Sequence, residues 1–177
     1  MPFHHNTKLA YYFKPGGWNP TRLDVMEHAT TLTQHIQASP ESVWAVITDI
    51  PGAAGTLSGV ESVQLLTDGP YGEGTRWRET RKMLGRSETV EMWVASVEPG
   101  RSTVVKAVQG GADYTTRFNL SPRDGGTDLT LTFGAEIIHP TVASRILMAL
   151  FGKLGMSVTR KALAKDLADI AAKAEAA

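Results

Sequence analysis

The sequence predicts an α+β fold, in which a curved antiparallel sheet of about seven strands wraps around one long C-terminal helix. Three observations predict it. Between residues 29 and 133, alternating apolar and polar segments are separated by turns rich in glycine and proline. Two short helical segments follow the first strand. From Pro140 onward, apolar residues recur at helical spacing, and only this helix is long enough to cover the sheet.

The composition is that of one globular domain. The chain has 177 residues, of which 42% are hydrophobic and 20% are charged. Eighteen basic residues balance eighteen acidic ones, so we expect no nucleic-acid partner. Cysteine is absent, which excludes disulfides, thiolate catalysis and cysteine-bound metals. No segment approaches the roughly 20 apolar residues of a membrane span, and no signal-peptide core is visible, so a cytoplasmic location is expected.

Residues 1–28 are predicted to form an irregular N-terminal arm, and residues 29–177 a single domain. The arm contains aromatic residues and the turn Pro15-Gly16-Gly17 but no sustained period. Its aromatic residues suggest that it docks on the domain or on a partner. His4 and His5 have no third metal ligand nearby, and Met26 is a candidate alternative start.

The first strand is predicted to lead directly into a short helix. Residues 30–37 alternate, with Leu32, Gln34 and Ile36 on one face. Ser39 suits the N-cap of the helix, and Pro40 suits its first position, where no N–H is needed. A second short helical or looped passage is expected before Gly59.

Six more strands are expected, joined in hairpin succession. Their approximate ranges are 60–66, 75–81, 87–97, 102–108, 114–120 and 127–133. The strand over residues 87–97 has two apolar faces, and a bulge near Ala95 would reconcile them. The C-terminal helix is then predicted from Pro140 to the end of the chain, with its apolar stripe at residues 146, 150, 154, 158, 163, 167 and 170.

This order of elements resembles the helix-grip fold of the START-like superfamily, also called SRPBCC. Its polyketide cyclase/dehydrase and lipid-transport branch is the nearest match. The residues that carry the resemblance are Ile36–Trp44 with Asp49, Gly72–Trp77, Val97-Glu98-Pro99 and Gly126–Thr130, and it covers Ala29 to about Ala172. The family implies a cavity between sheet and helix that receives a hydrophobic small molecule. Because its members include hormone receptors, lipid carriers, cyclases and chaperone-activating domains, the resemblance does not settle a reaction.

Such a cavity would be lined by the inward positions of the strands and of the helix. The apolar candidates are Trp77, Tyr114, Phe118, Leu131 and Phe133 from the sheet, and Met148, Phe151 and Met156 from the helix. Aromatic and methionine side chains suit flat or greasy ligands because they offer a large, adaptable apolar area. The alternative is that these residues simply fill a core.

Three polar residues, Gln34, Glu79 and Arg81, share the inward parity of their strands. A carboxylate in an apolar cavity has a raised pKa, so Glu79 is the candidate general acid or base for a cyclisation or dehydration. Arg81 offers the alternative of an ion pair that keeps Glu79 charged and inert.

Other kinds of chemistry find little support. His35 has the opposite parity to Ile36 and is expected to face solvent. No two histidines have the spacing of metal ligands on a helix, and no nucleophile elbow is present, so we expect neither a metal nor a cofactor.

The sequence therefore predicts a protein that binds a hydrophobic or aromatic small molecule, as a carrier or sequestering protein. One alternative is a cyclase- or dehydratase-like enzyme acting in the same cavity. Another is a protein-interaction module that uses the outer face of the sheet, where Arg76, Arg78 and Arg117 are expected. Whether the chain forms a homodimer is left open.

Overall fold

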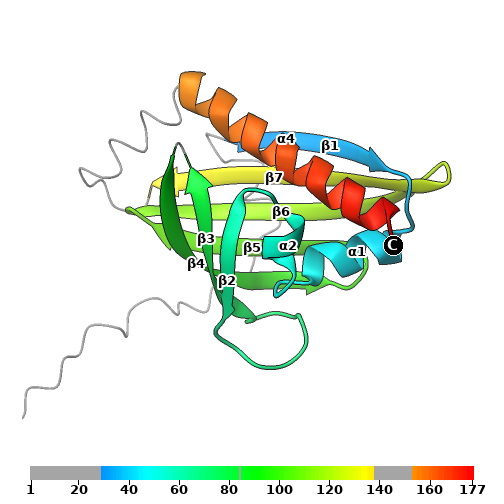
Figure 1. The fold of residues 1–177 in the computed structure, drawn as a ribbon, viewed down its shortest axis with the longest axis horizontal. Helices are drawn as coiled ribbons and strands as arrows, with labels where there is room; N and C mark the ends of the chain where they lie inside the picture. Colours follow the sequence, from blue (N-terminus) through cyan, green and yellow to red (C-terminus); the bar gives the residue numbers. More distant parts are fainter. Residues whose placement is uncertain (1–28, 84, 138–152) are drawn as a thin grey trace, which may run out of the picture.

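Seven strands form a single antiparallel sheet in the order β1-β7-β6-β5-β4-β3-β2 (Figure 1). The computed structural model describes residues 29–83, 85–137 and 153–177. The strands are β1 (Ala29–Ile36), β2 (Val60–Leu65), β3 (Arg76–Met83), β4 (Arg86–Glu98), β5 (Ser102–Gln109), β6 (Ala112–Arg123) and β7 (Gly126–Ile137). Successive strands from β2 to β7 pair as hairpin neighbours, and β1 closes the order by pairing with β7. The predicted sheet is confirmed.

Two short helices, α1 (Pro40–Thr48) and α2 (Ala53–Thr56), connect β1 to β2. The Ser39 hydroxyl accepts a hydrogen bond from the backbone N–H of Ser42, and Pro40 occupies the start of α1, as predicted. Val43 is fully buried, and it fastens α1 to the core.

The C-terminal helix α4 (Lys153–Glu175) crosses the sheet and contacts β1, α1 and α2 (Figure 1). We call the sheet face that packs against α4 the inner face and the opposite one the outer face. Leu163, Leu167 and Ile170 of α4 belong to the core, as the apolar stripe predicts, whereas Val158 of the same predicted stripe is 41% exposed. The part of the helix predicted before Lys153 lies outside the described residues, and so does the predicted N-terminal arm.

The core on the inner face consists of two apolar clusters. The first joins α4 to β1, β6 and β7, with Ile36, Leu129 and Leu131 at its centre. The second contains Ile50, Trp77, Val94 and Val105, and it lies under β3, β4 and β5. The inner face is therefore apolar at both ends.

The two apolar faces of β4 are explained by a shift in register. Val94 pairs with Val105, whereas Ser96 pairs with Val104, so one extra residue is accommodated at Ala95. The expected bulge is thus present. It brings Met92, Val94 and Val97 to the same cluster under the sheet.

Candidate functional site

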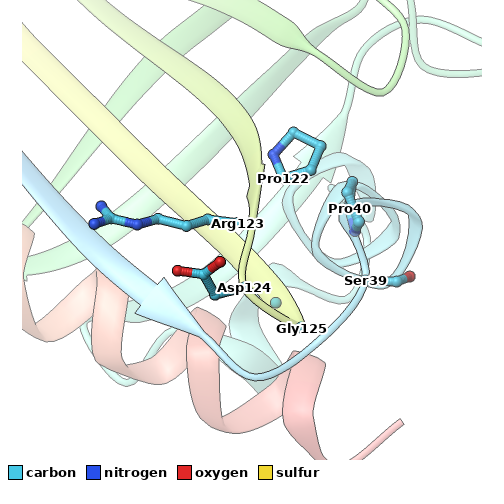
Figure 2. A pocket seen from close by; sticks show the side chains of 7 residues that line it. Ser39, Pro40, Pro122, Arg123, Asp124 and Gly125 are labelled. Atoms are coloured by element: carbon cyan, nitrogen blue, oxygen red, sulfur yellow. The ribbon is translucent and has the colours of Figure 1, made fainter.

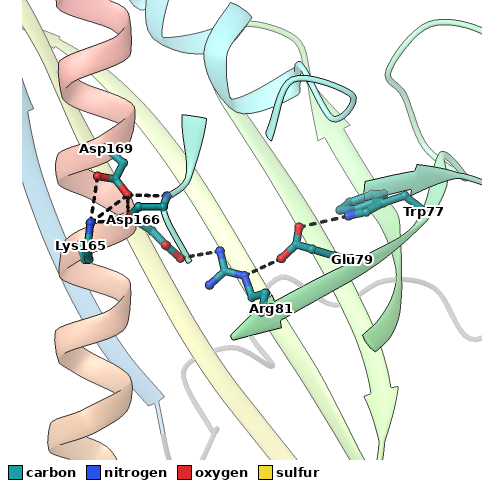
Figure 3. A network of polar contacts seen from close by, with 7 residues as sticks. Trp77, Glu79, Arg81, Lys165, Asp166 and Asp169 are labelled. Atoms are coloured by element: carbon teal, nitrogen blue, oxygen red, sulfur yellow. Dashed lines mark hydrogen bonds and ion pairs between the residues drawn. The ribbon is translucent and has the colours of Figure 1, made fainter. Parts of the chain in front are cut away.

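Three charged side chains meet between β3 and α4 (Figure 3). Arg81 Nε donates to Glu79 Oε1 over 2.6 Å, and Arg81 Nη2 donates to Asp166 Oδ2 over 2.8 Å. Trp77 Nε1 adds a long contact of 3.5 Å to the second oxygen of Glu79. Glu79 and Asp166 each keep only 8% of their surface exposed. We call Glu79, Arg81 and Asp166 the interior triad.

The alternation of β3 brings two members of the triad to the inner face. Trp77, Glu79 and Arg81 are separated by two residues each, so their side chains point to the same side of the sheet. Asp166 comes from the buried side of α4, three residues after Leu163 and four before Ile170. The helix therefore delivers a carboxylate from its otherwise apolar stripe to the guanidinium of β3.

Burial and charge act in opposite directions on the triad. Burial raises the pKa of Asp166, and the neighbouring guanidinium of Arg81 opposes that rise only in part. Burial lowers the pKa of Arg81, but the charges of Asp166 and Glu79 outweigh it and raise that pKa overall. Arg81 therefore stays charged, and its single positive charge is shared by two carboxylates.

A second polar cluster fastens the turn before β2 to α4. Asp169 Oδ2 accepts hydrogen bonds from the backbone N–H and the hydroxyl of Ser58, over 2.9 Å and 2.6 Å. Lys165 Nζ also donates to the Ser58 hydroxyl. Partial burial raises the pKa of Asp169, but the bonds from Ser58 and Lys165 lower it below its ordinary value. This cluster holds the rim of the interior next to Arg81 (Figure 3).

The five predicted apolar wall residues of the sheet lie on the inner face. Leu131 is fully buried in the first cluster, and Phe118 and Phe133 pack against that cluster. Tyr114 stacks on Phe133 with ring centroids 6.1 Å apart and an interplanar angle of 25°. Burial raises the pKa of the Tyr114 hydroxyl. Trp77 belongs to the second cluster, so the five residues are not gathered at one place on the inner face.

The other residues predicted for the site differ in where they lie. Gln34 is on the inner face, but its amide donates to the backbone oxygen of His35 over 3.0 Å and does not reach the triad. Met148 and Phe151 lie outside the described residues, and so does the side chain of Met156. The ion pair between Glu79 and Arg81, one of the two alternatives in the sequence, is present.

Asp166 was missed by the sequence reasoning, although a signal for it exists. The apolar stripe of α4 contains positions 163, 167, 170 and 174, and Asp166 falls within the same stripe. A charged residue at such a position requires a partner in the core. Arg81, one of the three polar residues predicted to point inward, was the matching candidate.

A surface hollow of about 440 Å³ lies at the far end of the sheet (Figure 2). It is lined by Ser39, Pro40, Pro122 and the turn from Arg123 to Gly126. These residues belong to the start of α1 and to the hairpin between β6 and β7, and none of them is a member of the interior triad. We therefore place the candidate site at the triad and not at this hollow.

Within residues 29–83, 85–137 and 153–177, no group of three histidine, aspartate or glutamate side chains is arranged to hold a metal ion. In the same part of the chain, no helix has the length and apolar character that a membrane crossing requires.

A family model described as "Polyketide cyclase / dehydrase and lipid transport" matches residues 27–175. No curated protein matches the chain significantly.

Solved structures share the fold at low sequence identity. The protein TTHA0849 from Thermus thermophilus is 20% identical with a TM-score of 0.68, over 84% of this chain and 97% of that one. The Zhui aromatase/cyclase from Streptomyces sp. R1128 is 18% identical with a TM-score of 0.71, over 83% and 93%. A START superfamily protein from Mycobacterium smegmatis is 18% identical with a TM-score of 0.61, over 79% and 94%. At these identities the likeness shows a common fold.

Proposed function

Because the chain belongs to the polyketide cyclase/dehydrase and lipid-transport family, we propose that it binds a hydrophobic or aromatic small molecule between the sheet and α4. The observation that carries the proposal is the interior triad, which lies between two apolar clusters of the inner face. Binding pockets combine a mostly apolar lining with a small number of placed polar groups, and the inner face has this composition.

The triad as a whole is not the arrangement that gives a core its greatest stability. Taking charged groups out of water costs several kcal/mol per ion, and replacing a buried ion pair by packed apolar side chains is often neutral or stabilising. A core designed only for stability would therefore do as well with apolar residues at positions 79, 81 and 166. A polar contact with a bound molecule explains why three charged residues are present in the interior.

The aromatic side chains favour a flat ligand. Tyr114 and Phe133 already stack on each other, and Trp77 presents a further ring on the inner face. Rings of this kind gain both apolar contact and favourable stacking geometry with an aromatic partner.

The proposal is tested with N-phenyl-1-naphthylamine, a neutral probe whose fluorescence rises in apolar surroundings. We expect saturable binding with one site per chain. Val90 pairs with Glu79 on the inner face, and its neighbour Thr89 faces outward and bonds Thr80. Val90→Trp should weaken binding by about tenfold or more because the indole occupies ligand space, which corresponds to about 1.4 kcal/mol.

Thr89→Trp is the matched control, since it adds the same indole one residue away on the outer face. Its affinity for the probe should equal that of the wild type. Absence of saturable binding to the wild type, or equal weakening by both variants, would contradict the proposal.

An enzyme of the cyclase or dehydratase type is the second candidate. It is favoured by the two buried carboxylates, of which Asp166 has a pKa raised by burial and could take up a proton. Native mass spectrometry of the purified protein would identify a bound molecule. If the protein converts that molecule and Glu79→Gln binds it without converting it, the enzyme hypothesis is supported, with Glu79 as the general acid or base.

The protein-interaction alternative has less support. Arg76 and Arg78 are on the outer face, but both pair with Glu91, at 3.2 Å and 3.6 Å. The Arg76 guanidinium also lies over the ring of Trp93, 5.5 Å from its centroid. These charges are partnered within the sheet, so they do not themselves point to a protein partner.

A further inference from the structure

The inner face carries an excess of negative charge at the candidate site. Within the triad, two carboxylates share the one positive charge of Arg81. Glu88 lies opposite Arg81 in the register of β3 and β4, so it adds a further negative charge to the same face at its exposed rim. Lys165 and Asp169 of α4 pair with each other, directly and through Ser58, so together they add no net charge to the site.

The triad also has unused hydrogen-bonding capacity. Among the described residues, the only bond to Glu79 Oε2 is the 3.5 Å contact from Trp77. Asp166 Oδ1 and Arg81 Nη1 have no hydrogen-bond partner in the same part of the chain. A carboxylate oxygen accepts a proton donor, and a guanidinium N–H donates to an oxygen. A ligand hydroxyl group both donates and accepts, so it can bond a carboxylate oxygen and the guanidinium N–H at once.

A ligand that carries a carboxylate is disfavoured at the triad, because it adds negative charge and has no proton to donate. The ligand carboxylate has no proton to donate to Glu79 or Asp166, and it would be the third carboxylate around one guanidinium. Like charges at such distances repel strongly where water is largely excluded. Its contact with Arg81 would also compete with bonds of 2.6 Å and 2.8 Å that are already formed.

We infer that this site selects a neutral apolar molecule that carries a hydroxyl group, and discriminates against the matching carboxylate. The inference rests on the proposed function and adds to it the chemical class of the ligand. Arg81 is thus not an anchor for an acid, although a lone arginine in an apolar pocket would suggest one.

The test compares two probes that share one ring system, 2-naphthol and 2-naphthoate, by calorimetric titration at neutral pH. The wild type should bind 2-naphthol about tenfold more tightly than 2-naphthoate, or more. Because any apolar pocket disfavours an ion, the assignment to the triad depends on a variant. Glu79→Gln removes one negative charge, and the preference for 2-naphthol should fall about fivefold or more.

Glu91→Gln is the matched control, because it makes the same change in charge on the outer face. It should leave the preference unchanged. If Glu79→Gln does not fold, as judged by circular dichroism, Asp166→Asn removes the other carboxylate charge of the triad and serves in its place.

The outcomes separate the inference from the proposed function. If 2-naphthoate binds as tightly as 2-naphthol, the inference is wrong and the binding function stands. Equal preferences in Glu79→Gln and Glu91→Gln would likewise overturn the role of the triad. If the wild type binds neither these probes nor N-phenyl-1-naphthylamine, the proposed function itself fails, and the inference fails with it.

Discussion

Arg81 connects two parts of the chain that are far apart in sequence. Its guanidinium neutralises Glu79 on its own strand and Asp166 on α4, and all three side chains are largely buried. Buried carboxylates keep their charge only while a partner compensates them. The stability of the interior therefore depends on Arg81 more than on either carboxylate.

The first prediction concerns this dependence. Arg81→Met keeps much of the side-chain volume but leaves two buried carboxylates uncompensated. We expect a loss of about 3 kcal/mol in the free energy of unfolding, measured by urea denaturation at pH 7. Arg101→Met is the control, since Arg101 pairs with Glu98 at 3.1 Å but its side chain is 77% exposed.

The control should change the free energy of unfolding by less than about 0.5 kcal/mol, because exposed ion pairs contribute little. Equal losses in the two variants would show that the triad does not carry a buried charge.

The second prediction concerns pH. Hydrogen bonds from Arg123 and His35, at 2.9 Å and 2.7 Å, hold the pKa of Asp128 below its ordinary value of 3.8. A lowered pKa in the folded state means that Asp128 stabilises the fold above its unfolded pKa, and that this contribution disappears as pH falls through the folded pKa. Asp128→Asn should therefore be less stable than the wild type at pH 7.

The difference between the two proteins should shrink as the pH falls below 3.8. Urea denaturation at a series of pH values measures it, with Asp68→Asn in an exposed loop as the control. A difference that stays constant down to the lowest pH would contradict the assignment.

Sequence reasoning could recover part of the site and not the rest. The alternation of β3 is local, so the common face of Trp77, Glu79 and Arg81 was predictable from spacing alone. The pairing of Arg81 with Asp166 spans 85 positions and depends on how α4 crosses the sheet. No local pattern contains that crossing, and the triad therefore became visible only in three dimensions.

At the scale of elements, the connection between β1, α1 and the β6–β7 hairpin is tightly packed. The Thr127 hydroxyl donates to the backbone oxygen of Ala38 over 2.8 Å. At Gly126, an added Cβ would collide with the backbone oxygen of Ile36 and lie 3.2 Å from the His35 ring. Glycine is needed here because the end of β1 approaches the backbone of β7, and not because of an unusual backbone angle.

The third prediction compares two glycines. Gly126→Ala should lower the free energy of unfolding by about 1–3 kcal/mol, because backbone cannot move aside cheaply. Gly55→Ala in α2 has nothing within 4 Å of the new methyl group, and alanine favours the helix by up to about 1 kcal/mol. Thermal unfolding followed by circular dichroism distinguishes them. A stabilising Gly126→Ala would disprove the close approach.

Elements were predicted more reliably than contacts, for a physical reason. The cap at Ser39, the proline at the start of α1 and the glycine-rich turns act over a few residues, and each leaves its mark in the sequence. The bulge at Ala95 could also be inferred, since the apolar pattern of β4 changes parity there. The pairing of β1 with β7 was not predicted, because it joins residues such as Thr31 and Thr132, which are 101 positions apart, and leaves no local signal.

At the scale of the whole molecule, α4 crosses the inner face of the sheet, which carries two apolar clusters, and the charged triad joins β3 to α4 (Figures 1 and 3). The family and the fold are established by the comparisons, whereas the ligand is a proposal. Its test must locate a bound molecule on one face of the sheet, since affinity alone would not exclude the outer face.

The fourth prediction supplies that location. Methyl groups report each face separately, because neighbouring residues of a strand point to opposite sides. Val63 and Val90 are on the inner face near Glu79, and Val108 is on the outer face with 49% of its surface exposed.

The most direct measurement is intermolecular nuclear Overhauser effects between 2-naphthol and methyl-labelled protein. We expect effects from the naphthol ring to the methyl groups of Val63 and Val90, and none to those of Val108. Effects confined to Val108 would place the ligand on the outer face and contradict an interior binding site.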